Sequence, residues 1–404
     1  MGIPCDRFVK IKHEHMNVAI ISSHPIQYNA PLFALLAKSA LLDIKVFYTW
    51  SQSKDALFDK DFGKTIQWDI PLLEGYPYEF VENVSKNPGP GSFRGIVCPQ
   101  LNQKIKDWGA EALLVYGWNY QAHYQAMKYF KGKVPVWFRG DSTLLDETGG
   151  LKQTLRRMIL RFVYRKADYA FFVGENNRQY YLKHGFHDDH LFFAPHAIDN
   201  HRFGDPTGEM RRDAEKLRAE LGIGNDDIAV LFVGKFEPKK NPLLLIRAGL
   251  QLQSPSVHYV FVGNGALERQ MKDLTSEKNT FHFLPFQNQS QMPVVYYLGD
   301  ILALPSQGPG ETWGLVVNEA MACGKAILVS DKSGCAVDLV KPGENGYIMA
   351  SGDTDQCVAL LEKMTKSWEY TRILGEASRR RIASWSFESI CKSFEINITT
   401  HTQK

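Results

Sequence analysis

The chain has 404 residues, of which 44% are hydrophobic and 23% are charged, and its formal net charge is +3 at pH 7. This length exceeds what one hydrophobic core usually supports, so we expect two domains. The charge is spread along the chain without a basic tail or a basic motif interleaved with aromatic residues, so no nucleic-acid partner is expected. Apolar runs such as residues 228–233 are only as long as strands, so no transmembrane span is expected.

The six cysteines are scattered along the chain and include no CxxC pair. This spacing predicts neither a metal centre nor a disulfide framework and favours reduced thiols in the cytosol. Residues 1–15 are polar and contain no apolar run of the kind found in a signal peptide. We therefore expect a cytoplasmic protein in which residues 1–15 form an N-terminal extension, since Met16 directly precedes the first strand.

Short apolar strands alternate with amphipathic helices, which is the pattern of a parallel α/β fold. In the first half, an irregular stretch reaches to about Gly95, and the polar segment 199–212 is expected to be a linker. The expected strands are 17–22, 43–48, 112–116, 134–138, 169–173 and 191–194, and the expected helices are 31–40, 99–108, 120–130, 151–166 and 175–184.

Helix 151–166 is strongly amphipathic, with apolar residues at helical spacing and basic residues opposite them. Two interpretations are open. The helix could lie against anionic lipid and present the protein to a lipid-linked acceptor. Alternatively it packs its apolar face on the core and leaves a solvated basic face, which we favour because the next strand follows at once.

The second half repeats the alternation of strands and helices. Two doubly wound domains that face each other bring the carboxyl ends of both sets of strands to one cleft, where ligands bind to parallel sheets. The expected strands are 229–233, 257–262, 280–284, 300–304 and 326–329, and the expected helices are 241–252, 267–274, 314–323, 358–366 and 370–382.

The most informative stretch is Gly308-Pro-Gly-Glu311-Thr-Trp-Gly-Leu-Val-Val-Asn-Glu319-Ala-Met-Ala-Cys-Gly324. It predicts a glycine-rich turn after an apolar strand, followed by a helix that ends at Gly324. One carboxylate then lies on the turn and the other about 9 Å further along the helix, at ~1.5 Å per residue. The N–H groups between them carry a partial positive charge. Such a turn suits phosphates on the N–H groups and hydroxyls on the carboxylates, and a nucleotide sugar offers both.

This stretch resembles the Glu-x7-Glu motif of retaining glycosyltransferases of family 4, which have the two-domain GT-B fold. The resemblance is close over the second half of the chain and loose over the first. It continues through Phe232-Val-Gly234-Lys235, Lys240-Asn241-Pro242, Phe261-Val-Gly263-Asn-Gly265, Val329-Ser-Asp331, Gly334, Asp338-Leu-Val340 and Asn345-Gly-Tyr347.

The resemblance implies four regions. Residues 1–15 precede the fold, 16–199 form a Rossmann-like acceptor domain, and 200–384 form a Rossmann-like domain that binds the nucleotide sugar. Residues 385–404, with the helix expected at 387–398, pack back onto the first domain.

The resemblance also implies the catalytic residues Glu311, Lys240 and Lys235. Glu311 would accept hydrogen bonds from the donor sugar, and the two lysines would neutralise the diphosphate. Lys235 stands where the family usually has an arginine, so its phosphate contact is expected to have looser geometry. The alternatives are a charge favourable at a helix N-terminus for Glu311 and a solvated loop for the lysines.

Further donor contacts are implied for Glu319, which would bind the ribose hydroxyls, although it could be a carboxylate on a helix surface. The Gly-Pro-Gly run, which lets backbone approach a ligand, favours the binding role. The other implied donor contacts are Gly234, Gly310, Thr312, Trp313, Gly314, Phe286 and Asn288. Gly263-Asn-Gly265 lacks the third glycine of a dinucleotide fingerprint, so packing is its expected role.

Acceptor or sugar contacts are expected from His24, Gln27 and Tyr28, which follow the first strand. A subset of the family has a similar His-Pro-Ile-Gln-Tyr run, and the alternative is a turn stiffened by proline with His24 merely exposed. Many relatives have a histidine in the region after the strand 134–138 that touches the sugar 6-hydroxyl, and here Arg139 or Asp141 replaces it. Asp141 could instead cap the turn that follows it, which we favour.

The resemblance implies a metal-independent hexosyltransferase-type enzyme without a cofactor other than the nucleotide-sugar co-substrate. It would move a sugar to a glycan or lipid-linked acceptor in bacterial surface-polysaccharide biosynthesis, in the cytoplasm, with contact to the inner face of the membrane left open. The alternatives are an epimerase or hydrolase of the same fold and a nucleotide-sugar-binding protein without transferase activity. A glycosidase is not expected, because its paired carboxylates flank the sugar bond itself.

Overall fold

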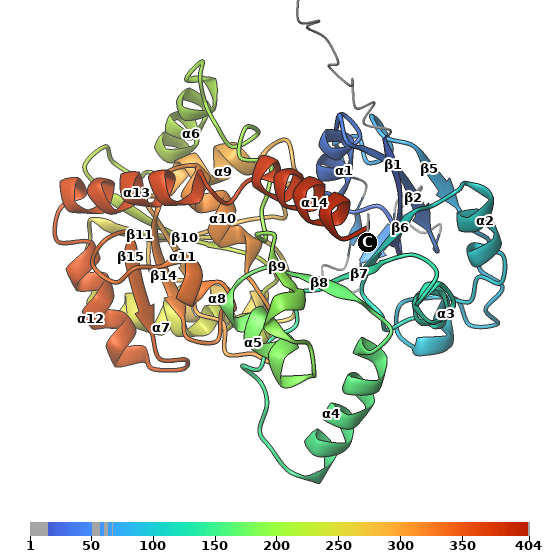
Figure 1. Cartoon of the computed structure of the whole chain (residues 1–404). Helices are drawn as coiled ribbons and strands as arrows, with labels where there is room; N and C mark the ends of the chain where they lie inside the picture. The colour runs from blue at the N-terminus through green and yellow to red at the C-terminus, as the bar shows by residue number, and fades with distance from the viewer. Residues whose placement is uncertain (1–14, 51–56, 60–63, 67, 403–404) are drawn as a thin grey trace, which may run out of the picture.

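The computed structural model describes residues 15–50, 57–59, 64–66 and 68–402, so the expected extension 1–15 lies almost wholly outside the described residues. Two parallel sheets form the centres of two α/β domains (Figure 1). Their strand orders are β5-β2-β1-β6-β7-β8-β9 and β12-β11-β10-β13-β14-β15, and a separate antiparallel pair is formed by β3 and β4. Each sheet has one buried apolar cluster on each face. The expected fold class, two doubly wound Rossmann-like domains, is confirmed.

The first domain follows the expected order of elements, with most differences at element ends. The stretch expected to be irregular contains β3, β4 and β5, so that expectation is wrong. The strands are β1 (Met16–Ser22), β2 (Leu42–Tyr48), β3 (Leu57–Asp59), β4 (Lys64–Ile66), β5 (Tyr78–Phe80), β6 (Ala112–Tyr116), β7 (Val136–Arg139), β8 (Tyr169–Phe172) and β9 (Leu191–Phe193). The helices are α1 (Ala30–Leu36), α2 (Leu101–Asp107), α3 (Gln121–Phe130), α4 (Leu151–Tyr164) and α5 (Glu175–Lys183), with short 3-10 turns at Phe93–Gly95 and Asp188–His190.

The second domain contains every strand and helix expected for it and four further elements. The strands are β10 (Ile228–Val233), β11 (Val257–Val262), β12 (Phe281–Leu284), β13 (Ile301–Leu304), β14 (Ala326–Ser330) and β15 (Gly346–Met349). The helices are α6 (Glu209–Glu220), α7 (Pro242–Leu252), α8 (Glu268–Thr275), α9 (Met292–Leu298), α10 (Leu315–Ala322), α11 (Ala336–Leu339), α12 (Thr354–Met364) and α13 (Trp368–Ile382), with a 3-10 turn at Pro238–Lys240.

Elements α6, α9, α11 and β15 were not expected, for different physical reasons. Helix α6 is highly charged and buries only Ala214, so it has little apolar periodicity, and its first turn lies in the segment expected to be a linker. Helix α9 was missed for the opposite reason. It is apolar on most sides and buries five of its seven residues, so its sequence has no polar face that would reveal a helical period. Helix α11 and strand β15 have four residues each, too few to show a period.

Helix α14 (Phe387–Thr402) leaves the second domain and lies on the first (Figure 1). Its residues Phe387, Ile390, Phe394 and Ile398 are buried in the cluster that includes β1 and α1. Glu395 of α14 accepts a hydrogen bond of 2.5 Å from Ser39 Oγ, which follows α1. The end of the chain therefore ties the two domains together.

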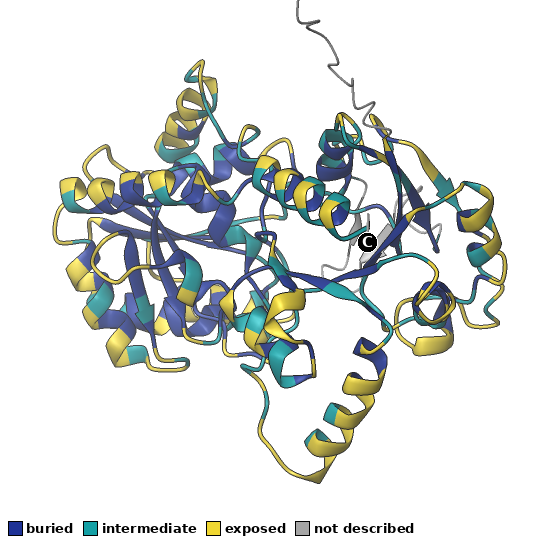
Figure 2. Cartoon of the chain, viewed as in Figure 1, coloured by how far each residue is buried: buried dark blue, intermediate teal, exposed yellow. Residues whose placement is uncertain are grey.

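Helix α4 corrects the interpretation that we favoured from the sequence. Its apolar residues at 151, 155, 158, 159 and 162 are exposed, and only Leu160, Val163 and Tyr164 are buried. The helix projects from the body of the first domain, and most of its surface faces solvent (Figure 2). Among the described helices, none is long and apolar enough to cross a bilayer.

Candidate functional site

The glycine-rich turn expected between β13 and α10 is present. Gly308, Gly310 and Gly314 have φ angles of +73°, +93° and +100°, a region that favours glycine. Helix α10 starts after Gly314, and Gly324 follows its C-terminus with a φ of +72° and donates to the Met321 carbonyl. The strand, the turn and both ends of the helix are therefore as the sequence predicts.

Four consecutive backbone N–H groups in this turn lack acceptors. Gly310 N–H donates to a side chain, but the N–H groups of Glu311, Thr312, Trp313 and Gly314 donate to no protein group in the described part of the chain. Backbone N–H groups of folded proteins nearly always find an acceptor, and those at the start of a helix carry a partial positive charge. The turn therefore offers a row of donors suited to an anion.

Lys240 and Glu311 form an ion pair beside this row. The Lys240 ammonium contacts Glu311 Oε2, and the two side chains are 18% and 9% exposed. Ser306 Oγ donates to the same oxygen at 2.8 Å. Glu311 therefore has acceptor capacity left on its second oxygen, and Lys240, which lies in the turn after β10, has two further N–H donors.

Glu319 is buried on α10 and holds two tyrosine hydroxyls. Tyr296 Oη donates to Oε2 at 2.6 Å, and Tyr28 Oη of the first domain donates to Oε1 at 3.2 Å. Burial raises the pKa of Glu319. Burial also raises the pKa of Tyr28 and that of Tyr296, so both phenols remain donors. Glu319 is thus no surface carboxylate, and its oxygens are oriented to accept hydroxyl groups.

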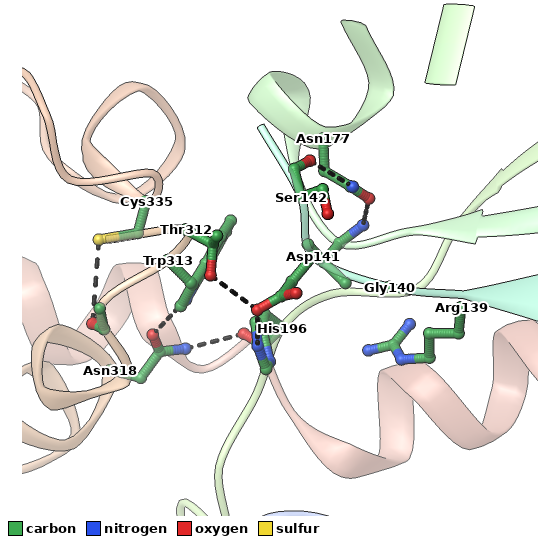
Figure 3. A network of polar contacts seen from close by, with 12 residues as sticks. Arg139, Gly140, Asp141, Ser142, Asn177, His196, Thr312, Trp313, Asn318 and Cys335 are labelled. Carbon is green, nitrogen blue, oxygen red and sulfur yellow. Dashed lines mark hydrogen bonds and ion pairs between the residues drawn. The ribbon is translucent and has the colours of Figure 1, made fainter. Parts of the chain in front are cut away.

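Two carboxylates of the first domain reach the same turn from the segment after β7, and Figure 3 shows one of them, Asp141. Asp141 Oδ2 accepts from Thr312 Oγ1 at 2.8 Å, and Asp146 Oδ2 accepts from Gly310 N–H at 2.8 Å. The local cap that we favoured for Asp141 is therefore wrong. The contact of Asp146 shows that the turn binds an oxygen anion in this structure.

The Trp313 side chain fixes the turn against the first domain. Its Nε1–H donates to Asn318 Oδ1 at 2.8 Å, and Asn318 Nδ2 donates to the His196 carbonyl at 2.9 Å (Figure 3). The Trp313 ring lies 5.5 Å from the His196 ring, whose pKa is lowered by burial to about 4. Because the indole is packed in this way, a nucleotide-sugar donor could reach only the backbone of Trp313.

The other first-domain candidates have partners within their own domain. Arg139 is buried and donates to the carbonyls of Ala194 and Pro195 at 2.8 and 2.9 Å. Its guanidinium forms no ion pair with Asp141, and Figure 3 draws no contact between the two side chains. His24 contacts Ser23 and lies edge-on to Trp50, and burial lowers its pKa. Gln27 is half-buried beside Tyr28. Among all the first-domain candidates, it is Tyr28 and Asp141 that contact the second domain.

The remaining donor candidates lie in turns after strands of the second sheet. Lys235 is half-buried after β10, and Gly234 has a φ of +146° with no atom within 4 Å of the place of a Cβ. Phe286 N–H donates to Asn264 Oδ1 at 3.0 Å, and Asn288 Oδ1 accepts from Gln289 N–H at 2.9 Å. A Cβ on Gly263 would lie 2.0 Å from the Gly234 carbonyl, so the packing role expected for Gly263-Asn-Gly265 is confirmed.

Sequence reasoning missed Tyr296, Asp146 and Ser306 as members of this site. Tyr296 lies on the unexpected helix α9, and no local pattern marks it. Asp146 lies seven positions after β7, in a segment whose route depends on domain packing. Ser306 belongs to the motif itself, and its place directly before the glycine-rich turn was a usable signal.

Asp338 of α11 links the two domains through backbone of α5. Its two oxygens accept from Glu175 N–H at 3.2 and 3.0 Å. Burial raises the pKa of Asp338 to about 6, against the opposing effect of that hydrogen bond. Because this pKa lies above the ordinary value of 3.8, protonation favours the folded state. Protonated Asp338 therefore stabilises the fold fully below pH 3.8, the ordinary pKa, and this stabilisation is lost as the pH rises through 6.

We expect Asp338→Asn to remove this pH dependence, because the amide does not titrate. Urea unfolding of both proteins on either side of pH 6 measures it. The wild-type free energy of unfolding should fall relative to that of the variant as the pH rises through 6. A constant difference between the two proteins across this range would contradict the assignment.

Within residues 15–50, 57–59, 64–66 and 68–402, no group of three or more His, Cys, Asp or Glu side chains could hold a metal ion. The expected metal independence stays a prediction.

Residues 213–381 match the family model described as glycosyl transferases, group 1. Relatives similar to the chain include the D-inositol 3-phosphate glycosyltransferase of Mycobacterium ulcerans, 27% identical over 187 residues, which are 44% of this chain and 39% of the relative. Another is the lipopolysaccharide 1,2-N-acetylglucosaminetransferase of Salmonella typhimurium, 28% identical over 198 residues, or 46% of this chain and 51% of the relative. The chain thus covers about half or less of the length of these relatives.

Solved structures resemble the whole chain. The Anabaena HepE structure in complex with UDP and glucose has a TM-score of 0.71 and 18% identity and covers 96% of this chain and 100% of its own. WaaG, a glycosyltransferase involved in lipopolysaccharide biosynthesis, has a TM-score of 0.64 and 15% identity and covers 95% and 99%. The chain has the GT-B fold. In this GT-B protein the turn before α10 lies at the meeting point of the two domains.

Proposed function

We propose that the protein transfers a sugar from a nucleotide-diphosphate sugar to a glycan or lipid-linked acceptor and retains the configuration of the anomeric carbon. The observation that carries this proposal is the row of free N–H groups at residues 311–314 beside the Lys240–Glu311 pair. A row of donors, an ammonium group and a carboxylate within one turn match a diphosphate joined to a sugar.

The diphosphate is assigned to the N–H groups of Thr312, Trp313 and Gly314 and to Lys240, with Lys235 as a second cation. The open space over Gly234 and Gly310, where a Cβ would meet no atom within 4 Å, lets a ligand approach the backbone there. Lys235 supplies charge without the fork of a guanidinium, so it contributes less to orientation than an arginine at this position would.

The hydroxyl groups of the donor are assigned to the two carboxylates. Glu311 accepts from the transferred sugar through its second oxygen. Glu319 accepts from the ribose, and the hydrogen bond that it accepts from the Tyr28 hydroxyl supports this assignment. We assign the base to backbone near Phe286 and Asn288, in the turn after β12.

In the proposed reaction the bond between the anomeric carbon and the diphosphate oxygen breaks, and its electron pair stays on the diphosphate. The acceptor hydroxyl forms the new bond on the same face and gives its proton to the released diphosphate. Lys240 and the N–H row stabilise the developing negative charge. This assignment needs neither a metal nor a covalent enzyme intermediate. Closure of the two domains excludes water, which suppresses hydrolysis of the donor.

Two features of the similar proteins support the proposal. A structure of HepE was solved with UDP-glucose, and the matched relatives include an enzyme of lipopolysaccharide synthesis. We therefore propose UDP-sugars as the first donors to test and bacterial surface polysaccharide as the acceptor class, with a cytoplasmic site of action.

The test is a thermal-shift screen of UDP-, GDP- and ADP-sugars, followed by NMR analysis of products from the stabilising donor and a mixture of glycan acceptors. We expect stabilisation by one nucleotide series, because a ligand that binds only the folded state raises apparent stability. The product should be a new glycoside with the anomeric configuration of the donor, formed at the same rate after EDTA treatment.

Each other outcome supports a different account. An inverted glycoside contradicts retention, and EDTA sensitivity contradicts metal independence. Free or epimerised sugar supports the hydrolase or epimerase alternative. A bound and unchanged donor supports the binding-protein alternative.

A further inference from the structure

Helix α4 presents a continuous apolar stripe to solvent. Its residues Leu151, Leu155, Met158, Ile159 and Phe162 are 91%, 56%, 57%, 51% and 56% exposed. On a helix of about 3.6 residues per turn they share one stripe about 100° wide. Exposed apolar residues are common singly, but a contiguous group on one face marks an interaction surface.

The stripe does not belong to the core of the first domain. Leu160 and Tyr164, on the face of α4 opposite to the stripe, and Val163, beside the stripe, are buried in the cluster formed with α3 and α5. The N-terminal part of α4 extends beyond this anchor into solvent (Figures 1 and 2). Among the described residues, the helix is therefore anchored outside the stripe, while the stripe itself stays exposed.

The charge around the stripe has one sign. The segment 151–166 contains six basic residues and no acidic residue. By helical geometry Lys152 and Arg156 lie on one side of the stripe, and Arg161 and Arg165 on the other. None of the basic residues of this segment takes part in an ion pair with a carboxylate in the described part of the chain.

We propose that α4 docks this protein onto the surface of an anionic lipid bilayer. An amphipathic helix of this kind lies in the interface, with its apolar stripe at the boundary of headgroups and acyl chains and its basic flanks on lipid phosphates. A second copy of the chain is a poorer occupant, because two such helices face to face would bring two sets of uncompensated cations together.

The path of the chain connects this surface to the proposed donor site. The segment between β7 and α4 contacts the second domain through Asp141 and Asp146, and Lys332 Nζ donates to the Leu145 carbonyl at 2.6 Å. Five residues after Asp146, α4 begins. Docking would therefore hold the domain interface near the bilayer, where a lipid-linked acceptor resides. This last consequence rests on the proposed function, whereas the docking itself does not.

The test is flotation of the full chain with vesicles made of equal amounts of phosphatidylglycerol and phosphatidylcholine, compared with pure phosphatidylcholine. We expect binding to the anionic vesicles, weakened by added salt. The apolar variant L155S/F162S and the charge variant R156E/R161E should each lower the partition coefficient by about 10-fold or more. The matched controls are I396S on α14, which is 52% exposed, and K128E/R380E, also on the surface.

The variants change exposed positions, so the melting temperature without ligand should be unaffected and reports intact folding. No binding to anionic vesicles, or equal binding by the wild type and both α4 variants, would overturn the proposal. A wild type that elutes as a dimer, and becomes a monomer in L155S/F162S, would assign the stripe to a second copy instead. Because flotation uses no donor, its result is independent of whether the protein is a transferase.

Discussion

Replacing Lys240 by methionine is expected to lower kcat for sugar transfer by about 10²- to 10³-fold, the loss typical for removal of one charge-stabilising donor. The Lys240 ammonium is 18% exposed and already contacts Glu311, so it is held beside the turn before a ligand arrives. Steady-state kinetics with the donor found in the thermal-shift screen measure the effect. Near-wild-type turnover would refute the role of Lys240.

Two further variants separate catalysis from stability. Lys240→Met leaves the Glu311 carboxylate, 9% exposed, without its cation, which costs about 1–3 kcal/mol of stability. The double variant K240M/E311Q removes that unpaired charge, so it should regain stability but not activity. The neighbouring Lys239 is 44% exposed and pairs with Glu237 instead. Lys239→Met should therefore keep full turnover.

Replacing Glu319 by glutamine is expected to raise the dissociation constant of the nucleotide by about 10- to 100-fold, since a hydrogen bond to a charged group contributes about 1.5–3 kcal/mol. The amide keeps the volume of the side chain and can still accept from one tyrosine. It loses the charge and one acceptor that the ribose hydroxyls would use.

Isothermal titration calorimetry with the free nucleotide diphosphate measures this change. Glu344→Gln, at an exposed carboxylate of the same domain, is the matched control and should leave the affinity unchanged. Burial raises the pKa of Glu319, so removal of its charge should not destabilise the fold. Unchanged affinity of Glu319→Gln would remove Glu319 from the donor site.

Apart from α6, α9, α11 and β15, the elements of the second domain and its glycine-rich turn were predictable because their signals are local. The glycines at 308, 310 and 314 are the sequence signal for the turn, because its backbone needs a positive φ at these positions. Gly324 is the corresponding signal for the end of α10. Strand β10 is buried at every residue, so it is a continuous apolar run in the sequence. The pairing of Lys240 with Glu311 follows once β10 and β13 are neighbours in the sheet.

The contributions of the first domain were predictable only as a short list of candidates. Tyr28 and Asp141 meet the second domain, whereas Arg139 turns to carbonyls after β9. Tyr28 and Asp141 follow strands of one sheet and Arg139 ends one of them, and local sequence does not encode which of the three faces the partner domain. Asp146 reaches Gly310 because of the way in which the domains pack.

Helix α4 shows a second limit of predictions that rest on the spacing of apolar residues. The spacing of its apolar residues correctly predicts one apolar stripe, but a period does not say what covers that stripe. The helix buries Leu160, Val163 and Tyr164, which lie outside the stripe, and these residues anchor it to the first domain. The stripe was therefore free to face solvent.

The central claim is that the turn before α10 holds the diphosphate of an activated sugar. A crystal structure of the full chain with the stabilising nucleotide sugar tests it most directly. We predict the diphosphate on Lys240 and on the N–H groups of residues 312–314, with the ribose hydroxyls on Glu319. A nucleotide sugar bound elsewhere, with these N–H groups still lacking an acceptor, would contradict the account.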